Sequence, residues 1–223
     1  MAATIAVVDY CKGNLASVQR GLADAGYDAR ITDSPADILA ADGVVLPGVG
    51  AFTDAMTTME GTGQADALRT AVADGVPFLG ICLGMHLLFD WGDEGQPEGE
   101  RLAGLGVLPG HVERMTAFDA FGKKHKIPHV GWNSVEFVDG VGEHEGAMRL
   151  FADIEDGGHF YFTHSYCAVP DNEDDLVATS EHARRFACAV ARNNVFGVQF
   201  HPEKSSHLGL RLLENFGSVV GGF

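Results

Sequence analysis

The sequence of 223 residues has few cysteines and few lysines, and it lacks long apolar runs. Its four cysteines are scattered without a Cys-x-x-Cys pair, so neither a disulfide framework nor a paired-cysteine metal site is expected. The His-Glu-x-x-His motif is absent, and the ten histidines form no recognisable set of metal ligands. We therefore expect free thiols, no metal and no other cofactor.

No apolar run approaches the roughly 18 residues that a membrane-spanning helix needs, and the N-terminus lacks the basic segment of a secretory signal. These absences predict a cytoplasmic protein without a membrane partner. The 15 basic residues are outnumbered by 31 acidic ones, which gives a formal net charge of -16. Such a charge argues against binding to nucleic acid or to an anionic membrane surface.

The excess of acid, combined with only five lysines, resembles adaptation to a salty cytoplasm, so we expect a halophilic protein. Acidic residues are densest at 171–175 and recur at Asp93-Glu94. We interpret both stretches as solvated loops, because charged runs lie in most cases on the surface.

Apolar and helical segments alternate along the first half of the sequence. Short runs rich in β-branched residues are separated by segments with apolar residues at helical spacing. Strands are predicted at residues 4–9, 29–32, 44–46 and 78–81, and helices at 15–25, 66–73 and 85–91. This order predicts an α/β fold with a mainly parallel open sheet and helices on both faces.

The second half contains closely spaced strand-like segments with turn residues between them. The expected strands are residues 107–108, 129–138, 160–164, 176–180, 186–191 and 195–200. They predict antiparallel strands in the C-terminal half, followed by an amphipathic helix at 208–219. No linker, repeat or low-complexity tract interrupts the chain, so we expect a single domain over residues 1–223.

The segment Gly80-Ile81-Cys82-Leu83-Gly84 has the pattern of a nucleophile elbow, with cysteine in the place of serine. Its two glycines permit the tight, strained turn that presents a thiol at the end of a strand. The helix that is expected to follow favours the reactive thiolate, and the N–H of Leu83 can point at a developing oxyanion. Taken alone, the pattern also fits a buried structural cysteine.

A thiol nucleophile needs a base, and Phe200-His201-Pro202-Glu203 offers one directly after an apolar strand. Pro202 favours an extended His201, and residues i and i+2 of an extended segment project to the same side. We therefore expect Glu203 to hydrogen-bond one imidazole nitrogen while the other faces Cys82.

The turn Pro47-Gly48-Val49-Gly50 follows another expected strand. A phosphate-binding loop would continue into Gly-Lys-Ser/Thr, which is missing here. Because glycines let the backbone approach a ligand closely, we interpret this turn as the source of a second oxyanion donor.

Together, the cysteine elbow, the His-Pro-Glu segment and the Pro-Gly-Val-Gly turn resemble the class I (triad-type) glutamine amidotransferases over about residues 5–220. Members of this class hydrolyse glutamine to glutamate and ammonia. Five stretches resemble the branch that works with a separate cyclase in histidine biosynthesis. They are residues 9–18, 47–52, 130–133, 161–166 and 199–205.

The resemblance implies a role for each matching residue. Cys82 would form a γ-glutamyl thioester, His201 would activate the thiol and protonate the departing ammonia, and Glu203 would orient His201. The N–H groups of Val49 and Leu83 would form the oxyanion hole. Glutamine would be held by Gly48, Gly50, His86, His164, Ser165 and Tyr166. The partner would be contacted by Asn14, Trp132, Tyr161 and Lys204.

The implied partner is a cyclase subunit with a (βα)8 barrel, which forms a heterodimer with this chain and conducts ammonia to its own substrate. Two residues depart from the pattern: His86 stands where the family usually has Gln, and Cys11 where it often has Gly. The role of His86 stays open, because an imidazole can donate or accept but differs in shape. Two alternatives also remain, the glutaminase of another class I enzyme and a non-catalytic binding module.

Overall fold

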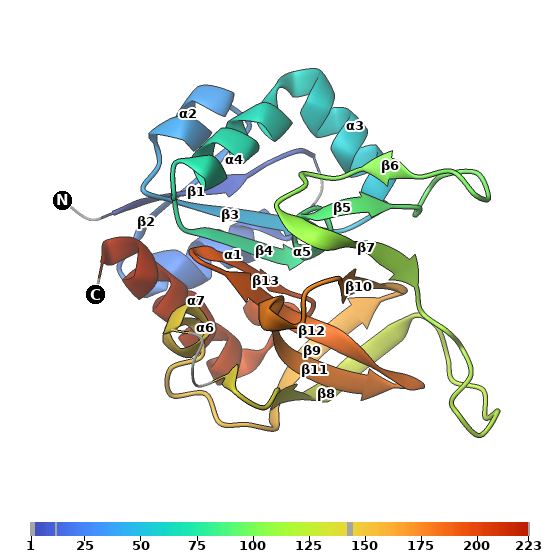
Figure 1. Ribbon diagram of the computed structural model, residues 1–223. Helices are drawn as coiled ribbons and strands as arrows, with labels where there is room; N and C mark the ends of the chain where they lie inside the picture. Colours follow the sequence, from blue (N-terminus) through green and yellow to red (C-terminus); the bar gives the residue numbers. More distant parts are fainter. Residues whose placement is uncertain (1–2, 12, 142–144, 223) are drawn as a thin grey trace.

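The computed structural model describes residues 3–11, 13–141 and 145–222 (Figure 1). Its first five strands in space pair in parallel, as the β-α-β rhythm predicts. In spatial order they are β2 (Asp28–Thr32), β1 (Thr4–Val8), β3 (Gly43–Gly48), β4 (Phe78–Cys82) and β13 (Val195–Val198). The carboxyl ends of these strands therefore meet at one edge of the sheet.

Beyond β13 the sheet becomes mainly antiparallel, as predicted for the C-terminal half. The order continues through β12 (Arg184–Arg192), β10 (Tyr166–Pro170), β7 (Leu108–Arg114), β5 (Phe89–Gly92) and β6 (Leu102–Ala103). A branch adds β11 (Leu176–His182), β8 (His129–Phe137) and β9 (Gly158–His164). One internal pair, β5 with β7, is parallel.

Helices cover both faces of the parallel strands (Figure 1). On one face lie α1 (Leu15–Asp24), α6 (Glu145–Leu150) and α7 (Ser206–Gly221). On the other lie α2 (Pro35–Ala40), α3 (Phe52–Thr62) and α4 (Gln64–Ala73). None of the helices in the described part of the chain is long and apolar enough to cross a membrane.

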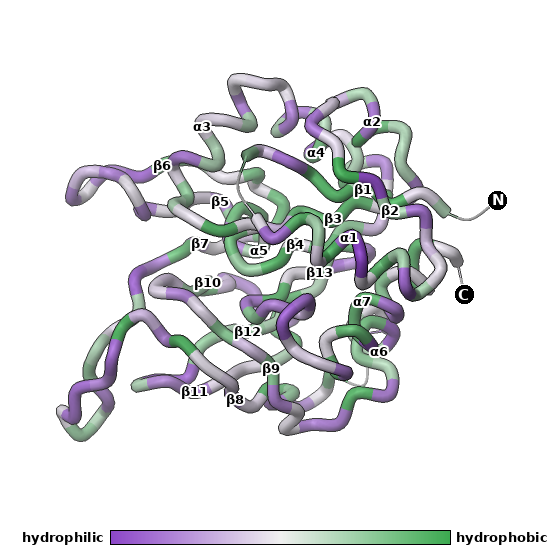
Figure 2. Tube along the Cα trace, turned by 180° about the vertical axis from the view of Figure 1, so that it is seen from behind, coloured by the Kyte–Doolittle hydropathy of each residue, from purple (hydrophilic) through white to green (hydrophobic). Residues whose placement is uncertain are grey.

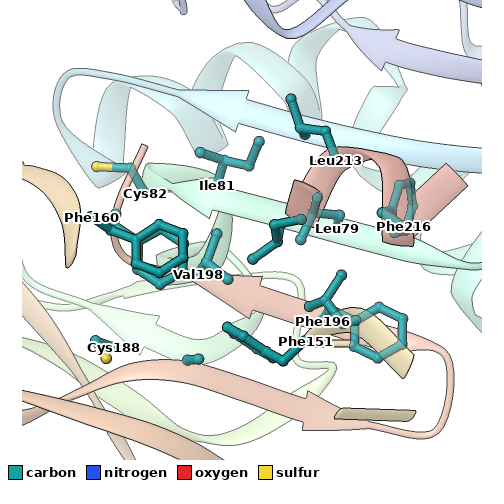
Figure 3. Close-up of a cluster of buried hydrophobic side chains, with 14 of the residues drawn as sticks. Leu79, Ile81, Cys82, Phe151, Phe160, Cys188, Phe196, Val198, Leu213 and Phe216 are labelled. Carbon is teal, nitrogen blue, oxygen red and sulfur yellow. The ribbon is translucent and has the colours of Figure 1, made fainter. Parts of the chain in front are cut away.

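Alternate residues of the central strands enter two separate cores. Leu79 and Ile81 of β4 pack with Phe216 of α7, whereas Phe78 of β4 packs with Met56 of α3. Because both faces are covered, these strands form nearly continuous apolar runs, visible as the green central strands of Figure 2. Figure 3 shows Cys82 at one end of the first core, with its sulfur pointing away from Leu79 and Phe216.

Three expected elements differ from the structure. The helix predicted at residues 85–91 is wrong: α5 (Leu83–His86) is a single turn, and β5 begins at Phe89 after two turn residues. Short apolar runs fit a buried strand as well as a helix, and pairing with β6 and β7 decides between them here. The strand predicted at 107–108 begins at Leu108 and extends to Arg114, and the one predicted at 195–200 ends at Val198.

The acidic stretches are less solvated than expected. Asp175 is buried, with 3% of its surface exposed, and forms an ion pair with Arg192. Glu94 turns inward at the end of β5, where its carboxylate accepts a hydrogen bond from the N–H of Phe52. The prediction of a solvated loop is therefore wrong for Asp175, whereas Glu94 lies in a loop but is half-buried.

Candidate active site

Cys82 ends β4 and precedes α5, with φ +54° and ψ -108°. This backbone conformation is strained for any residue with a side chain, and it places the sulfur at the carboxyl edge of the sheet. The two flanking glycines allow the turn. A Cβ on Gly80 would lie 2.5 Å from the carbonyl oxygen of Gly84, and one on Gly84 would overlap the carbonyl oxygen of Leu46. The sequence Gly-x-Cys-x-Gly thus forms a sharp elbow.

His201 and Glu203 reach the same edge from β13. Val198 pairs with Ile81 in the parallel register, so the chain after β13 emerges beside Cys82. His201 is extended, and its Nδ1 lies 2.9 Å from Oε1 of Glu203, with 2% of each side chain exposed. The chain does not continue as the extended segment predicted from the sequence: a 3-10 turn (η3, Pro202–Lys204) returns the carboxylate to the ring.

The backbone of His201 is held on both sides. Its N–H donates to the carbonyl oxygen of Tyr161 at 2.9 Å. Its own carbonyl oxygen accepts from Oγ of Ser205 at 2.6 Å. The backbone of His201 is therefore held by β9 and by the residue before α7, and Glu203 holds the ring, which is the positioning that a general base needs.

Electrostatics favours a protonated His201. Burial alone would lower the pKa of His201, but the influence of Cys82 and Glu203 outweighs it and raises this pKa to about 9. Nε2 makes no hydrogen bond of good geometry with any described residue. An imidazolium beside a cysteine stabilises the thiolate, so the arrangement can perform nucleophilic chemistry at neutral pH.

A small pocket opens in front of Cys82. It is lined by Val49, Gly50, Cys82, Leu83, His86, Glu94, Thr163, His164, Ser165 and Tyr166. The structure thus brings together both expected oxyanion donors and nearly all expected substrate residues. Gly48 is the exception among the latter: it lies under Tyr10, and a Cβ there would overlap the Tyr10 hydroxyl.

Three residues near the sulfur were not identified from the sequence. Glu94 and Thr163 line the pocket, and Gln199 donates from Nε2 to Sγ of Cys82 at 3.7 Å. Burial raises the pKa of Glu94, although the N–H of Phe52 opposes this effect. The Asp93-Glu94 pair was interpreted as a loop, and an amide such as Gln199 carries neither charge nor nucleophile to single it out.

The residues expected to contact a partner form one group beside the catalytic candidates. Asn14 donates to Oε1 of Glu203 at 3.5 Å. Trp132 is 53% exposed, and its ring meets the edge of Tyr161 with 6.2 Å between ring centroids. Nζ of Lys204 lies 5.9 Å from the centroid of the same tyrosine ring. An exposed tryptophan of this kind is typical of interface residues.

Known proteins resemble this chain over nearly its whole length. The family model described as glutamine amidotransferase class-I matches residues 6–219. The imidazole glycerol phosphate synthase subunit HisH of Moorella thermoacetica is 48% identical over 97% of this chain and 95% of its own. The HisH subunit of Desulfitobacterium hafniense strain Y51 is 45% identical over 97% of this chain and 94% of its own.

Solved structures share the fold. PurLQS from Thermotoga maritima superimposes with a TM-score of 0.68 at 17% identity, covering 100% of this chain and 99% of its own. A second structure, described as a glutamine amidotransferase, gives a TM-score of 0.66 at 22% identity, covering 97% of this chain and 98% of its own. From the family match and the identity to curated relatives, the chain belongs to the class I glutamine amidotransferases.

Proposed function

We propose that this chain is the glutaminase subunit of an imidazole glycerol phosphate synthase, and that it supplies ammonia to a separate cyclase subunit. The curated relatives bearing that name are 40–48% identical to it over nearly the full chain. The observation that carries the chemistry is the strained Cys82 elbow beside the His201–Glu203 pair, with Cys82 lining a pocket.

The pocket offers complementary groups for glutamine. The carboxylate of Glu94 suits the α-ammonium group, and the backbone around Ser165 and Tyr166 offers polar groups for the other end of the amino acid. The side-chain amide would then lie against Cys82, between Val49 and Leu83. We assign the substrate-binding role to this arrangement.

The reaction follows from these positions. The thiolate of Cys82 attacks the amide carbon, and the N–H groups of Val49 and Leu83 receive the charge that develops on oxygen. The imidazolium of His201 donates its proton to the departing nitrogen, which leaves as ammonia, and a γ-glutamyl thioester remains. Water, deprotonated by the neutral His201, then hydrolyses the thioester to glutamate and restores the thiolate.

The partner would dock on the group formed by Asn14, Trp132, Tyr161 and Lys204. Asn14 contacts the Glu203 carboxylate directly, so binding there can affect the catalytic residues. We propose a cyclase of (βα)8 fold, whose barrel receives ammonia without loss to water, and a heterodimer as the working unit.

One assay separates this proposal from its two alternatives. Glutamine hydrolysis is measured for the chain alone, with a cyclase, and with the cyclase plus its nucleotide substrate. The proposal predicts hydrolysis that rises with both additions. A rate of hydrolysis that does not change when the cyclase is added indicates the glutaminase of another class I enzyme. The absence of hydrolysis under all conditions indicates a binding module.

The Glu203→Gln variant is expected to lose activity and to change its pH profile. Glu203 helps raise the pKa of His201, so without its charge the imidazolium loses its proton at lower pH. The alkaline limb of kcat/KM should move to lower pH, and kcat should fall by about 10²–10⁴-fold, since the ring also loses its orienting partner. An unaltered pH profile in a folded variant would exclude this role for Glu203.

Salt is expected to stabilise the protein, as the halophilic interpretation implies. With a formal charge of -16, acidic side chains repel one another at low ionic strength. At about 1 M KCl the Debye length falls to about 3 Å, which screens this repulsion. The melting temperature should therefore rise by several degrees between tens of millimolar and about 1 M KCl. Sucrose is the control, because it stabilises folded proteins without screening charge repulsion. A melting temperature that stays flat or falls as KCl rises contradicts the halophilic interpretation.

A further inference from the structure

Gln199 is fully buried and lies directly against the candidate nucleophile. It follows the last residue of β13, and because Val198 pairs with Ile81, it emerges beside Cys82. Its Nε2 donates to Sγ of Cys82 at 3.7 Å, and its Oε1 lies 2.7 Å from Nε2 of His86. One amide therefore connects the imidazole on α5 to the sulfur.

The tautomer of neutral His86 is coupled to the way this amide points. Burial lowers the pKa of His86 to about 4, despite the opposing hydrogen bond to Gln199, so the ring is neutral near pH 7. With its N–H on Nε2, the ring donates to Oε1 and leaves the amide NH₂ to face the sulfur. The reverse orientation would place an amide oxygen against a thiolate, which puts two acceptors in contact.

We propose that Gln199 is a positioning residue that stabilises the thiolate of Cys82, and that His86 sets the orientation of its amide. The inference rests on the proposed function, in which Cys82 is the nucleophile, and deepens it. It also gives a role to the imidazole that replaces the usual glutamine of the family: Nε2 of His86 is occupied by Gln199, while the ring still borders the pocket.

Titratable groups from several elements surround the sulfur. They are Tyr10 after β1, His86 on α5, Glu94 after β5, His164 on β9, Tyr166 on β10 and His201 after β13. Burial lowers the pKa of His86 and of His164, so both are neutral near pH 7, and the imidazolium of His201 is the cation that favours the thiolate. The carboxylate of Glu94 opposes it. The amide of Gln199 donates a hydrogen bond but does not titrate. Its loss should therefore shift the midpoint of the alkylation rate of Cys82 against pH, without adding a second ionisation step.

The test is the rate of alkylation of Cys82 by iodoacetamide as a function of pH in the full chain. Mass spectrometry of the peptide that contains Cys82 gives the rate between about pH 5 and 10, because only the thiolate reacts. Cys11, a free and exposed cysteine of the same molecule, serves as the internal control. The variants are Gln199→Met, which keeps the length but has no donor, His86→Phe, which releases the amide, and His86→Gln, which can still donate.

The midpoint of the Cys82 profile should rise by about one pH unit in Gln199→Met. At a pH below the midpoints of both proteins, the variant should therefore be alkylated about tenfold more slowly than the wild type. His86→Phe should shift it in the same direction, and His86→Gln should keep it near the original value. The Cys11 profile should not move in any variant. An unmoved Cys82 midpoint in folded Gln199→Met overturns the inference, and if that variant does not fold, an unmoved midpoint in His86→Phe does so.

The same samples, assayed for glutamine hydrolysis after addition of the cyclase and its nucleotide substrate, distinguish this inference from the proposed function. If complete alkylation of Cys82 leaves glutamine hydrolysis intact, the assignment of the nucleophile fails, whatever the variants show. If alkylation abolishes hydrolysis but the midpoint does not move in the variants, the nucleophile stands and the role of Gln199 is overturned.

Discussion

Cys82→Ala is expected to abolish glutamine hydrolysis, whereas synthesis from added ammonium salt by the complex with the cyclase continues. The loss should exceed about 10⁴-fold in kcat, since removal of a nucleophile leaves only binding and oxyanion stabilisation. No other cysteine among the described residues can take its place. Cys167 and Cys188 are buried, and burial raises the pKa of both thiols, that of Cys167 to about 12.

Cys11→Ala is the matched control for this experiment. It removes an exposed thiol by the same substitution and should leave glutamine hydrolysis intact. Co-elution of Cys82→Ala with the cyclase in size-exclusion chromatography, at the same volume as the wild-type complex, shows that the variant is folded and still binds its partner. Substantial glutamine hydrolysis by Cys82→Ala would falsify the assignment of the nucleophile.

The isolated chain is expected to hydrolyse glutamine very slowly, and the cyclase with its nucleotide substrate should raise the rate by about 10²–10³-fold. Hydrolysis without an acceptor wastes glutamine, and the proposed oxyanion donor Val49 lies just after the end of β3, outside any helix or strand. Val49 is 40% exposed and is followed by Gly50 at φ +107°. A flip of one peptide would aim or withdraw the Val49 N–H, and losing such a donor costs roughly 3–4 kcal/mol of transition-state stabilisation.

Steady-state glutamine hydrolysis across a cyclase titration, with and without nucleotide, checks this expectation. Trp132→Ala is the informative variant, because it removes an exposed side chain from the proposed docking group and leaves the pocket untouched. The Trp132→Ala variant should need a higher concentration of cyclase than the wild-type chain to reach the same rate of glutamine hydrolysis. A lone chain that already works at the full rate, unchanged by either addition, would exclude partner control.

The chemistry was easier to predict from the sequence than its surroundings were. Cys82 could be identified because a nucleophile elbow is local: two glycines, a preceding strand and a following helix lie within a few residues. The contact between His201 and Glu203 was predicted for a similar reason, although the 3-10 turn that makes it was not. Glu94 and Gln199 could not be found in this way, because their positions depend on which strands pair.

The same limit explains the incorrect helix at residues 85–91. Leu87, Leu88 and Phe89 are all buried, and an apolar run of this length carries no clear period. Leu87 and Leu88 form a turn, and pairing with β6 and β7 places Phe89 at the start of a strand, although β7 is separated from it in the sequence. Glu94 follows directly, so the error in this element also concealed a residue of the pocket.

The central claim is that Cys82 forms a covalent γ-glutamyl thioester during glutamine hydrolysis. The most direct measurement is mass spectrometry of the complex, quenched in acid during turnover with excess glutamine and then digested. The account predicts a γ-glutamyl adduct on the peptide that contains Cys82, on no other cysteine peptide, and absent from Cys82→Ser. Turnover of glutamine without that adduct, or with the adduct on another cysteine, would contradict it.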